Sequence, residues 1–299
     1  MPSSENEQAS AAPNADTISG DIPFRRELAV RVHVADILAL IAVPVVLIAV
    51  FALPETTRRS LAFSYTDPTV TTAFTAHFVH LDVNHLAGNV VGYSLLAGVG
   101  YTLAVVGRCR RFFFTALVTF LFAFPFVLSA LNLAVPRNAI GFGFSGINMA
   151  LVGLFPLLLG LYARERFFPS ASIRVLPALF FPLIGWIAAL VLPLSTSGPG
   201  LAGVAITVAG VLLGLIYALS TGVNRRWPLR EQVRTATSRP GYSDLFVVGV
   251  VLLVGYPFVG FPADPTGDGS VVNLYVHLLG FCLAFIGPFA LLAAGAFEE

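Results

Sequence analysis

The 299-residue sequence has few charged residues and no lysine. Asp, Glu, Lys and Arg make up 11% of the chain, whereas soluble globular domains carry about 25%. Hydrophobic residues reach 57%, and the mean hydropathy is +0.84. These values exclude an ordinary soluble domain and predict an all-α integral membrane protein. The net charge of +1 lacks the basic excess typical of nucleic-acid-binding proteins, so we expect no nucleic-acid partner.

Cysteine is also scarce, because the chain contains only Cys109 and Cys282. The two lie in different segments and form neither a CxxC motif nor a disulfide framework. Cys109 stands among arginines and is either an acylation site or a thiol without a function. The sequence has no HExxH motif and no glycine-rich phosphate loop with a lysine, so we expect neither a metal nor a cofactor.

The first 22 residues are rich in Ser, Ala, Asn and acids and show no apolar period, which predicts disorder. A cleavable signal would need a basic start followed directly by a short apolar core, and here the first apolar run begins near Val32. We therefore divide the chain into a disordered cytoplasmic tail, 1–31, and a transmembrane domain, 32–299.

The rest of the chain contains about eight apolar stretches of spanning length, joined by short connections that are polar or rich in Pro and Gly. This pattern predicts a polytopic membrane helix bundle. The predicted spans are 33–53, 83–107, 112–134, 145–163, 174–193, 200–221, 244–262 and 271–296.

The arginines sort by side when the N-terminus is placed in the cytoplasm, which predicts a multi-pass protein of the cell membrane in that orientation. Three then lie outside, namely Arg58, Arg59 and Arg137. Fourteen lie inside: Arg25, Arg26, Arg31, Arg108, Arg110, Arg111, Arg164, Arg166, Arg174, Arg225, Arg226, Arg230, Arg234 and Arg239. Asp36 lies near the inner boundary of the first span, where we expect its carboxylate to reach the surface.

In this orientation the second, fourth and eighth spans all run inward, so their first residues share one side of the membrane. Asn89 and His277 each lie roughly 9 Å into their spans, at about 1.5 Å per residue. Ser145 follows the apolar approach from Ile140 to Phe144. Polar groups at membrane depth are costly and usually face a cavity or one another. Ser and His at matching depth are the minimum set for nucleophilic catalysis.

The residues around these positions fit that chemistry. Glycines at 141, 143 and 146 permit a tight approach to a helix start at Ser145, whose free N–H groups would stabilise an oxyanion. His85 and Asn89 are four residues apart, on one helical face, and could add two donors. Gly280 lies three residues after His277 and would let that helix approach another closely.

Together these motifs resemble the rhomboid intramembrane serine proteases, in the order and topology of that family. The matching positions are His80, His85, Asn89, Gly143, Ser145, Gly146, His277 and Gly280. The resemblance implies a six-helix core and a dyad in which Ser145 is the nucleophile and His277 the general base. It implies an oxyanion hole formed by Asn89, His85 and the backbone N–H of Ser145. It also implies a structural role for His80, bonding within the loop before the second span, and transmembrane proteins as substrates.

Two features depart from the family pattern. Three predicted spans within 174–262 separate the serine and histidine helices where the family has one, so the sequence does not tell which would form the substrate gate. The loop at about 55–82, expected to flank the site, has Arg58 and Arg59 but no Trp-Arg pair.

Other interpretations remain open from the sequence. Taken singly, Ser145 could be a helix cap and His277 or Asn89 a helix-pairing residue. A catalytically inactive relative that binds transmembrane helices is the main alternative function. A small transporter is a third, but it predicts an internal repeat that the sequence does not contain.

Overall fold

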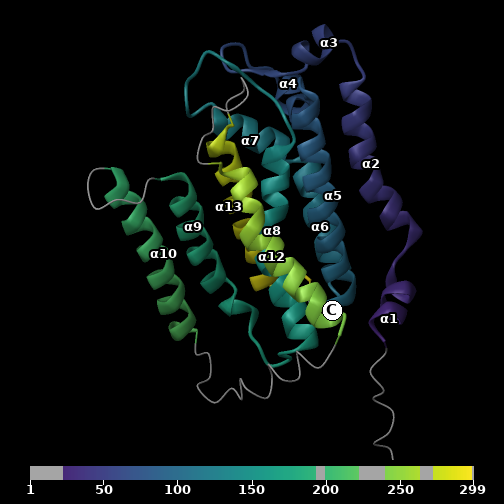
Figure 1. The fold of residues 1–299 in the computed structure, drawn as a ribbon, viewed down its shortest axis with the longest axis vertical. Helices are drawn as coiled ribbons and strands as arrows, with labels where there is room; N and C mark the ends of the chain where they lie inside the picture. Colours follow the sequence, from purple (N-terminus) through teal and green to yellow (C-terminus); the bar gives the residue numbers. More distant parts are fainter. Residues whose placement is uncertain (1–22, 193–198, 222–239, 263–271, 298–299) are drawn as a thin grey trace, which may run out of the picture.

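The protein is an all-α polytopic helix bundle (Figure 1). It is seen here as a computed structural model that describes residues 23–192, 199–221, 240–262 and 272–297. The outer helices and linkers are α1 (Phe24–Arg31), α2 (Val34–Phe51), α3 (Glu55–Ser60), α4 (Val70–Thr75), η2 (Ala76–Phe78) and η3 (Ile173–Val175). The other helices are α5 (Val83–Val106), α6 (Arg110–Phe122), α7 (Phe124–Asn132), α8 (Ser145–Arg166), α9 (Pro177–Val191), α10 (Pro199–Ser220), α12 (Tyr242–Gly260) and α13 (Leu274–Ala293).

Seven of these helices are long and apolar enough to cross a membrane, which makes this a multi-pass membrane protein. They are α2, α5, α8, α9, α10, α12 and α13. The pair α6 and α7 is bent by 48° and supplies an eighth span if it is counted as one broken span. Pro125 lies at the start of α7 and lacks the N–H that would continue the ladder of α6. The prediction of about eight spans is therefore met, with a bend that it did not include.

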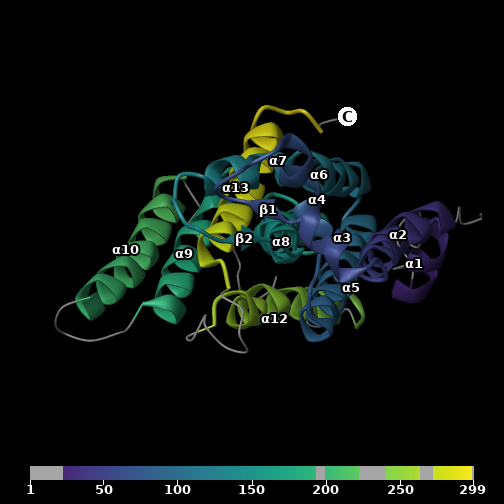
Figure 2. The ribbon, with the colours of Figure 1, turned by 90° about the horizontal axis from the view of Figure 1, so that it is seen from above.

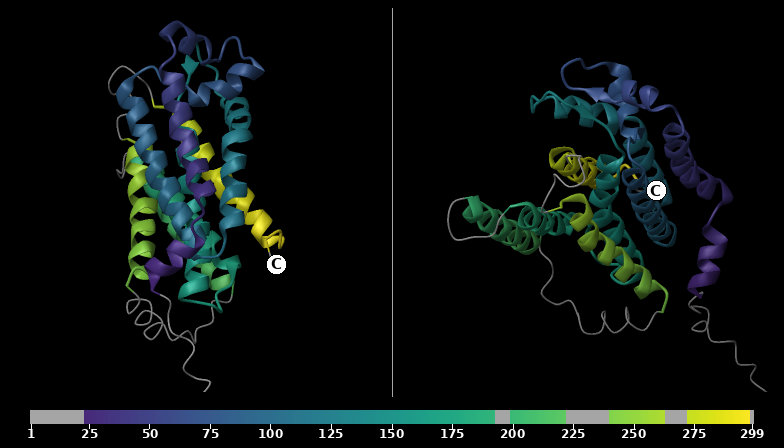
Figure 3. Two further views of the ribbon diagram at one scale, coloured as in Figure 1. Left: turned by 90° about the vertical axis from the view of Figure 1, so that its right-hand side faces the viewer. Right: turned by 45° about the horizontal axis from the view of Figure 1, so that its top comes forward.

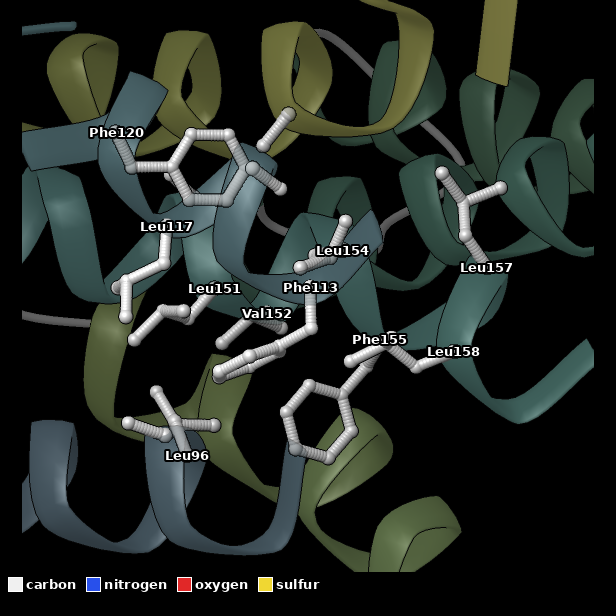
Figure 4. Close-up of a cluster of buried hydrophobic side chains, with 14 of the residues drawn as sticks. Leu96, Phe113, Leu117, Phe120, Leu151, Val152, Leu154, Phe155, Leu157 and Leu158 are labelled. Carbon is white, nitrogen blue, oxygen red and sulfur yellow. The ribbon is translucent and has the colours of Figure 1, made fainter. Parts of the chain in front are cut away.

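The central element is α8, which other helices surround when the bundle is seen from above (Figure 2). The buried share of its span is 83%, against 17% for α2 and α10. Its neighbours are α5, α6, α12 and α13. Figure 4 shows how Phe155 of α8 packs with Phe113 of α6 and Leu96 of α5, all of them fully buried. The helix that begins with Ser145 is therefore the most constrained part of the molecule.

The hairpin of α9 and α10 lies at the periphery (Figures 1 and 2). Its two helices approach closely, because a Cβ at Gly210 would lie 2.5 Å from the Phe181 carbonyl oxygen. The hairpin contacts the bundle through α9. Phe180 stacks on Phe285 of α13 with ring centroids 4.5 Å apart, and the Trp186 indole N–H donates to the Val254 carbonyl of α12 over 3.1 Å.

The two ends of the bundle differ in character. Figure 3 shows the loop with α3 and α4 at one end and α1 at the other. The α1 end contains the helix ends from which Arg108 and Arg166 project, and Arg108 pairs with Glu165 there. The described arginines that were predicted to lie on the inner side are therefore grouped at one end of the bundle. Positions 225, 226, 230, 234 and 239 lie outside the described residues.

Residues 23–31 differ from the predicted disordered tail, because they form α1 and pack against the bundle. Glu27 is buried and forms an ion pair with Arg166 of α8. It also accepts a 2.5 Å hydrogen bond from the Tyr242 hydroxyl of α12. Two polar anchors thus order a segment whose apolar content alone does not predict structure. Residues 1–22 lie outside the described residues.

Asp36 also differs from expectation. Its carboxylate does not reach the surface but is buried, and it accepts hydrogen bonds from Arg110 at 2.5 and 2.6 Å and from the Tyr101 hydroxyl at 2.8 Å. The acid on α2 is thus neutralised by the first residue of α6. A carboxylate at a span boundary can pair as well as snorkel, and here a guanidinium is within reach.

The predicted loop at about 55–82 is folded and covers the Ser145 end of the bundle. Its strand β1 (Phe63–Ser64) pairs antiparallel with β2 (Ile140–Gly141), which directly precedes the Ser145 segment. Its helix α4 packs against α7, and the Thr75 hydroxyl donates to the Leu61 carbonyl over 2.8 Å. The loop therefore flanks the region predicted to be active.

Candidate functional site

The Ser145 hydroxyl and the His277 imidazole lie within hydrogen-bonding reach, although 132 positions separate them in sequence. Nε2 of His277 is 2.7 Å from Oγ of Ser145. The other ring nitrogen, Nδ1, lies 2.5 Å from the Gly260 carbonyl oxygen at the end of α12. A carbonyl can only accept, so Nδ1 carries the proton and Nε2 is left as the acceptor for the serine hydroxyl. This arrangement is that of a nucleophile with its general base.

Close contact between α8 and α13 brings the two side chains together. A Cβ added at Gly280 would lie 2.3 Å from the Gly146 carbonyl oxygen, and one at Gly153 would lie 2.1 Å from the Phe281 carbonyl oxygen. Neither position accepts a side chain without separating the helices. The predicted role of Gly280 in close packing is therefore what the geometry requires.

The chain reaches Ser145 through a turn that requires glycine. Gly143 has a φ of +110°, in the region that side chains rarely adopt. A Cβ there would also lie 2.7 Å from Cε1 of His85, so the imidazole occupies the space that a side chain would fill. Ser145 is the first residue of α8, and the N–H groups of a first helical turn lack intrahelical partners. In this turn the N–H groups of Ile147 and Asn148 donate to the Phe144 carbonyl, and Ser145 is half-buried.

Asn89 on α5 belongs to a buried polar cluster beside this turn. Its Nδ2 donates to His80 Nε2 over 3.1 Å and to the His85 carbonyl over 3.0 Å, which uses both amide hydrogens. The Nδ2 of Asn148, one turn after Ser145 on α8, donates to Asn89 Oδ1 over 3.2 Å. Asn89 is thus held from both sides, and it must release His80 to donate to a bound oxyanion.

His80 reaches further than the resemblance implied. Its Nε2 accepts from Asn89 and from the Phe144 backbone N–H at 3.4 Å, so it bonds to α5 and to the segment before Ser145, not only within its loop. Burial lowers the pKa of His80 to about 3. The ring is therefore neutral near pH 7, which the acceptor role of Nε2 needs.

Two further residues belong to this assembly, of which the sequence analysis noted Arg58 only as a charge in the flanking loop and did not include Asn148. Arg58 of α3 donates to the His80 carbonyl over 2.6 Å and fixes the loop above the site. Asn148 is fully buried and links α8 to α5. Asn148 could have been identified from the sequence, because an amide within an apolar span needs hydrogen-bond partners. The partner of Arg58 could not be predicted, because it is a backbone carbonyl.

Two buried histidines in the covering loop predict acid sensitivity. Burial lowers the pKa of His77 to about 4, and that of His80 to about 3, from the usual value of 6.5. The unfolded chain then binds more protons than the folded one below about pH 6.5, so stability is complete above that pH and is lost as the pH falls. We expect the unfolding temperature in detergent to fall between about pH 7 and pH 5.

Variants of two histidines provide the check on this acid sensitivity. His77→Gln should flatten the dependence of the unfolding temperature on pH, because it removes one of the two groups. His33 is exposed, so His33→Gln is the matched control and should leave the slope unchanged. Equal slopes in all three proteins would contradict the assignment.

No open cleft reaches the Ser145 hydroxyl among the best-formed clefts of the described residues. The two best-defined clefts lie at the arginine-rich end, and neither is lined by Ser145 or His277. Groups of three or more His, Cys, Asp or Glu side chains able to hold a metal are absent from the described residues. Ser145 is half-buried, and the strand that precedes it pairs with the loop 55–82.

Comparisons with known proteins add no relative. No family description, no curated protein and no solved structure matches this chain. The site has therefore to be interpreted from its own geometry.

Proposed function

We propose that this protein is an intramembrane serine endopeptidase of the rhomboid type. The observation that supports this most strongly is the 2.7 Å contact between Ser145 Oγ and His277 Nε2, in a bundle of membrane-spanning length. A serine or a histidine alone has structural explanations. A serine at a helix start, aligned with a histidine whose second nitrogen is held by a carbonyl, matches the requirements of a dyad.

In the proposed reaction, Ser145 Oγ attacks the carbonyl carbon of a peptide bond while His277 Nε2 accepts the hydroxyl proton. The negative charge on the carbonyl oxygen is stabilised by the backbone N–H of Ser145, with His85 and Asn89 as side-chain donors. His277 then donates the proton to the leaving amine, and an acyl-enzyme remains. Water, deprotonated by His277, hydrolyses this ester and restores the serine. No metal or cofactor takes part.

The substrates proposed are transmembrane segments of other proteins. The site lies within the bilayer-spanning part of the bundle, near the end away from most of the described arginines. Helix-breaking residues near the cut favour the extended conformation that a peptide bond needs in order to enter the site. In the proposed orientation, with the N-terminus cytoplasmic and the protein in the cell membrane, cleavage occurs near the outer face.

The helix best placed to act as a substrate gate is α12. It packs against α5 and α8 and precedes the histidine helix, whereas α10 packs mainly against α9. Tyr256 fills the seam between α12 and α5, because a Cβ at Gly92 would lie 2.1 Å from its hydroxyl oxygen. Parting of this seam would open a lateral path from the lipid to Ser145. In the rhomboid scheme, α12 then takes the place of the fifth helix, and α9 with α10 is an addition.

The direct test is cleavage in a reconstituted system. Purified protein in lipid vesicles is combined with a single-span substrate that carries glycine and proline near the end predicted to be outside, and the products are sized by mass spectrometry. The proposal predicts one or a few cuts near that end. The alternative function, a catalytically inactive protein that binds transmembrane helices, predicts co-purification of substrate without cleavage.

If His85 and Asn89 form the oxyanion hole, removing either side chain should lower the catalytic rate moderately. Asn89→Ala and His85→Ala should each lower kcat by roughly 10²-fold with little change in KM, because the donors act on charge that develops only in the transition state. The control is Asn84→Ala. Asn84 is exposed at the start of α5, one turn before Gly88, so this variant should retain full activity. An unchanged rate for Asn89→Ala would remove Asn89 from the site.

A further inference from the structure

A cleft of about 650 Å³ lies at the end of the bundle opposite Ser145. It is formed where α1, the turn between α5 and α6, the last turn of α8 and the end of α13 meet. The proposed protease function assigns no role to this cleft. Its lining combines two kinds of residue that differ sharply in chemistry.

Arginine dominates the polar part of the lining. Five guanidinium groups and one carboxylate face the cleft, from Arg31, Arg108, Arg110, Arg111, Arg164 and Glu165. Two further acids bind these arginines, since Glu27 pairs with Arg31 and Asp36 with Arg110. Glu27 is shared with Arg166, and Glu165 is the one carboxylate among the lining residues beside the five guanidinium groups.

Apolar side chains form the rest of the lining. Phe112 and Leu292 are buried, and Leu161 is partly buried beside them. The cleft lies where the apolar spans α5 and α8 end, which is the level of lipid head groups in a bilayer. A basic rim beside an apolar wall matches a molecule that has an anionic head and an apolar body.

The turn that carries Arg108 is held in an unusual conformation. Arg108 has a φ of +55°, and it is the one residue other than glycine with a positive φ in the described part of the chain. The turn also lies tightly against α8, because a Cβ at Gly107 would be 3.1 Å from the Tyr162 Cα. Backbone strain of this kind concentrates at functional sites, and here it places a guanidinium on the rim of the cleft.

From these features we infer that the cleft binds a phosphate-bearing anion, with the phosphodiester of an anionic phospholipid as the occupant that the apolar wall favours. Arginine provides paired N–H donors that match phosphate oxygens. Basic pockets between membrane helices bind lipid head groups by this chemistry. Covalent acylation at the same place is disfavoured, because burial raises the pKa of the Cys109 thiol to about 12 and leaves little thiolate. The inference does not depend on the protease function.

The test is native mass spectrometry of the full chain, freed of lipid in detergent and titrated with phosphatidylglycerol or phosphatidylcholine of the same acyl chains. We expect preferential binding of phosphatidylglycerol. Each arginine near a membrane surface contributes roughly a fivefold factor, so Arg108→Gln with Arg164→Gln should weaken that binding by roughly 30-fold. Arg108→Lys with Arg164→Lys retains the charge and should keep most of the affinity.

The matched control is Arg25→Gln with Arg26→Gln, which removes two exposed charges from α1 without touching the cleft. An equal loss of binding in this control would show only a general attraction to a basic surface and would overturn the site. Equal binding of the two lipids would overturn it as well. Competition with glycerol 3-phosphate distinguishes a soluble phosphate ester from a membrane lipid as the natural occupant of the cleft. Displacement at millimolar concentration assigns the cleft to a soluble phosphate ester, and persistence of the lipid assigns it to the membrane.

Discussion

Ser145→Ala and His277→Ala should each abolish cleavage of a reconstituted transmembrane substrate, with a fall in rate of roughly 10⁴- to 10⁶-fold. The reason is geometric, because the two groups share one 2.7 Å contact and the described residues place no acidic third member on His277. Its second nitrogen meets the Gly260 carbonyl instead. The rate is measured from product formation at saturating substrate.

The double variant gives a stronger test than either single change. Groups that act as one unit lose their effect together, so Ser145→Ala with His277→Ala should be no slower than either alone. Additive losses would mean that the two residues act independently. Ser145→Ala should unfold near the native temperature, whereas the two proteins without His277 should unfold lower, because they lose a buried ring and its contact with the Gly260 carbonyl.

Gly280→Val should be nearly as damaging although residue 280 does not take part in the chemistry. A Cβ there would lie 2.3 Å from the Gly146 carbonyl oxygen, so valine must push α13 away from the first turn of α8. A displacement of about 1 Å between reacting groups costs on the order of 10² in rate, and loss of the Ser145–His277 contact costs more. We expect at least about a 10³-fold loss of activity.

The control for this substitution lies on the same helix. Gly287 has open space around its Cβ position, so Gly287→Val changes the composition of α13 equally without a clash. It should retain activity near that of the native chain. A similar loss in both variants would show that α13 tolerates no added volume anywhere, and the specific role of the close contact at Gly280 would fail.

The sequence already indicated the meeting of the two catalytic candidates. Sorting of arginines by side predicted that the spans of Ser145 and His277 run in the same direction, and their positions along the spans predicted equal depth. The structure brings them to 2.7 Å. The resemblance to rhomboid proteases stays a prediction, because no family model, curated protein or solved structure matches the chain.

The order in which the spans pack against one another could not be predicted from the sequence in the same way. The segments of α9, α10 and α12 are all strongly apolar, and in lipid an apolar face does not identify its partner, because the solvent is as apolar as another helix. Small residues and single polar contacts decide the packing instead. Examples are Gly210 against Phe181 and Trp186 against the Val254 carbonyl.

Two other differences arise from polar pairs between distant residues. Glu27 meets Arg166, and Asp36 meets Arg110, so a predicted tail becomes α1 and a predicted surface acid becomes buried. Charge counts along the sequence show that such residues exist but not that they meet. The bend between α6 and α7 was accessible, since Pro125 is visible in the sequence.

The central claim is that Ser145 is a nucleophile activated by His277, and the site of fluorophosphonate labelling tests it most directly. The purified chain in lipid is treated with the reagent, digested and sequenced by mass spectrometry. We predict one adduct, on Ser145, that disappears in His277→Ala as well as in Ser145→Ala. Labelling that persists in Ser145→Ala, or an adduct on a different serine, would contradict the proposed dyad.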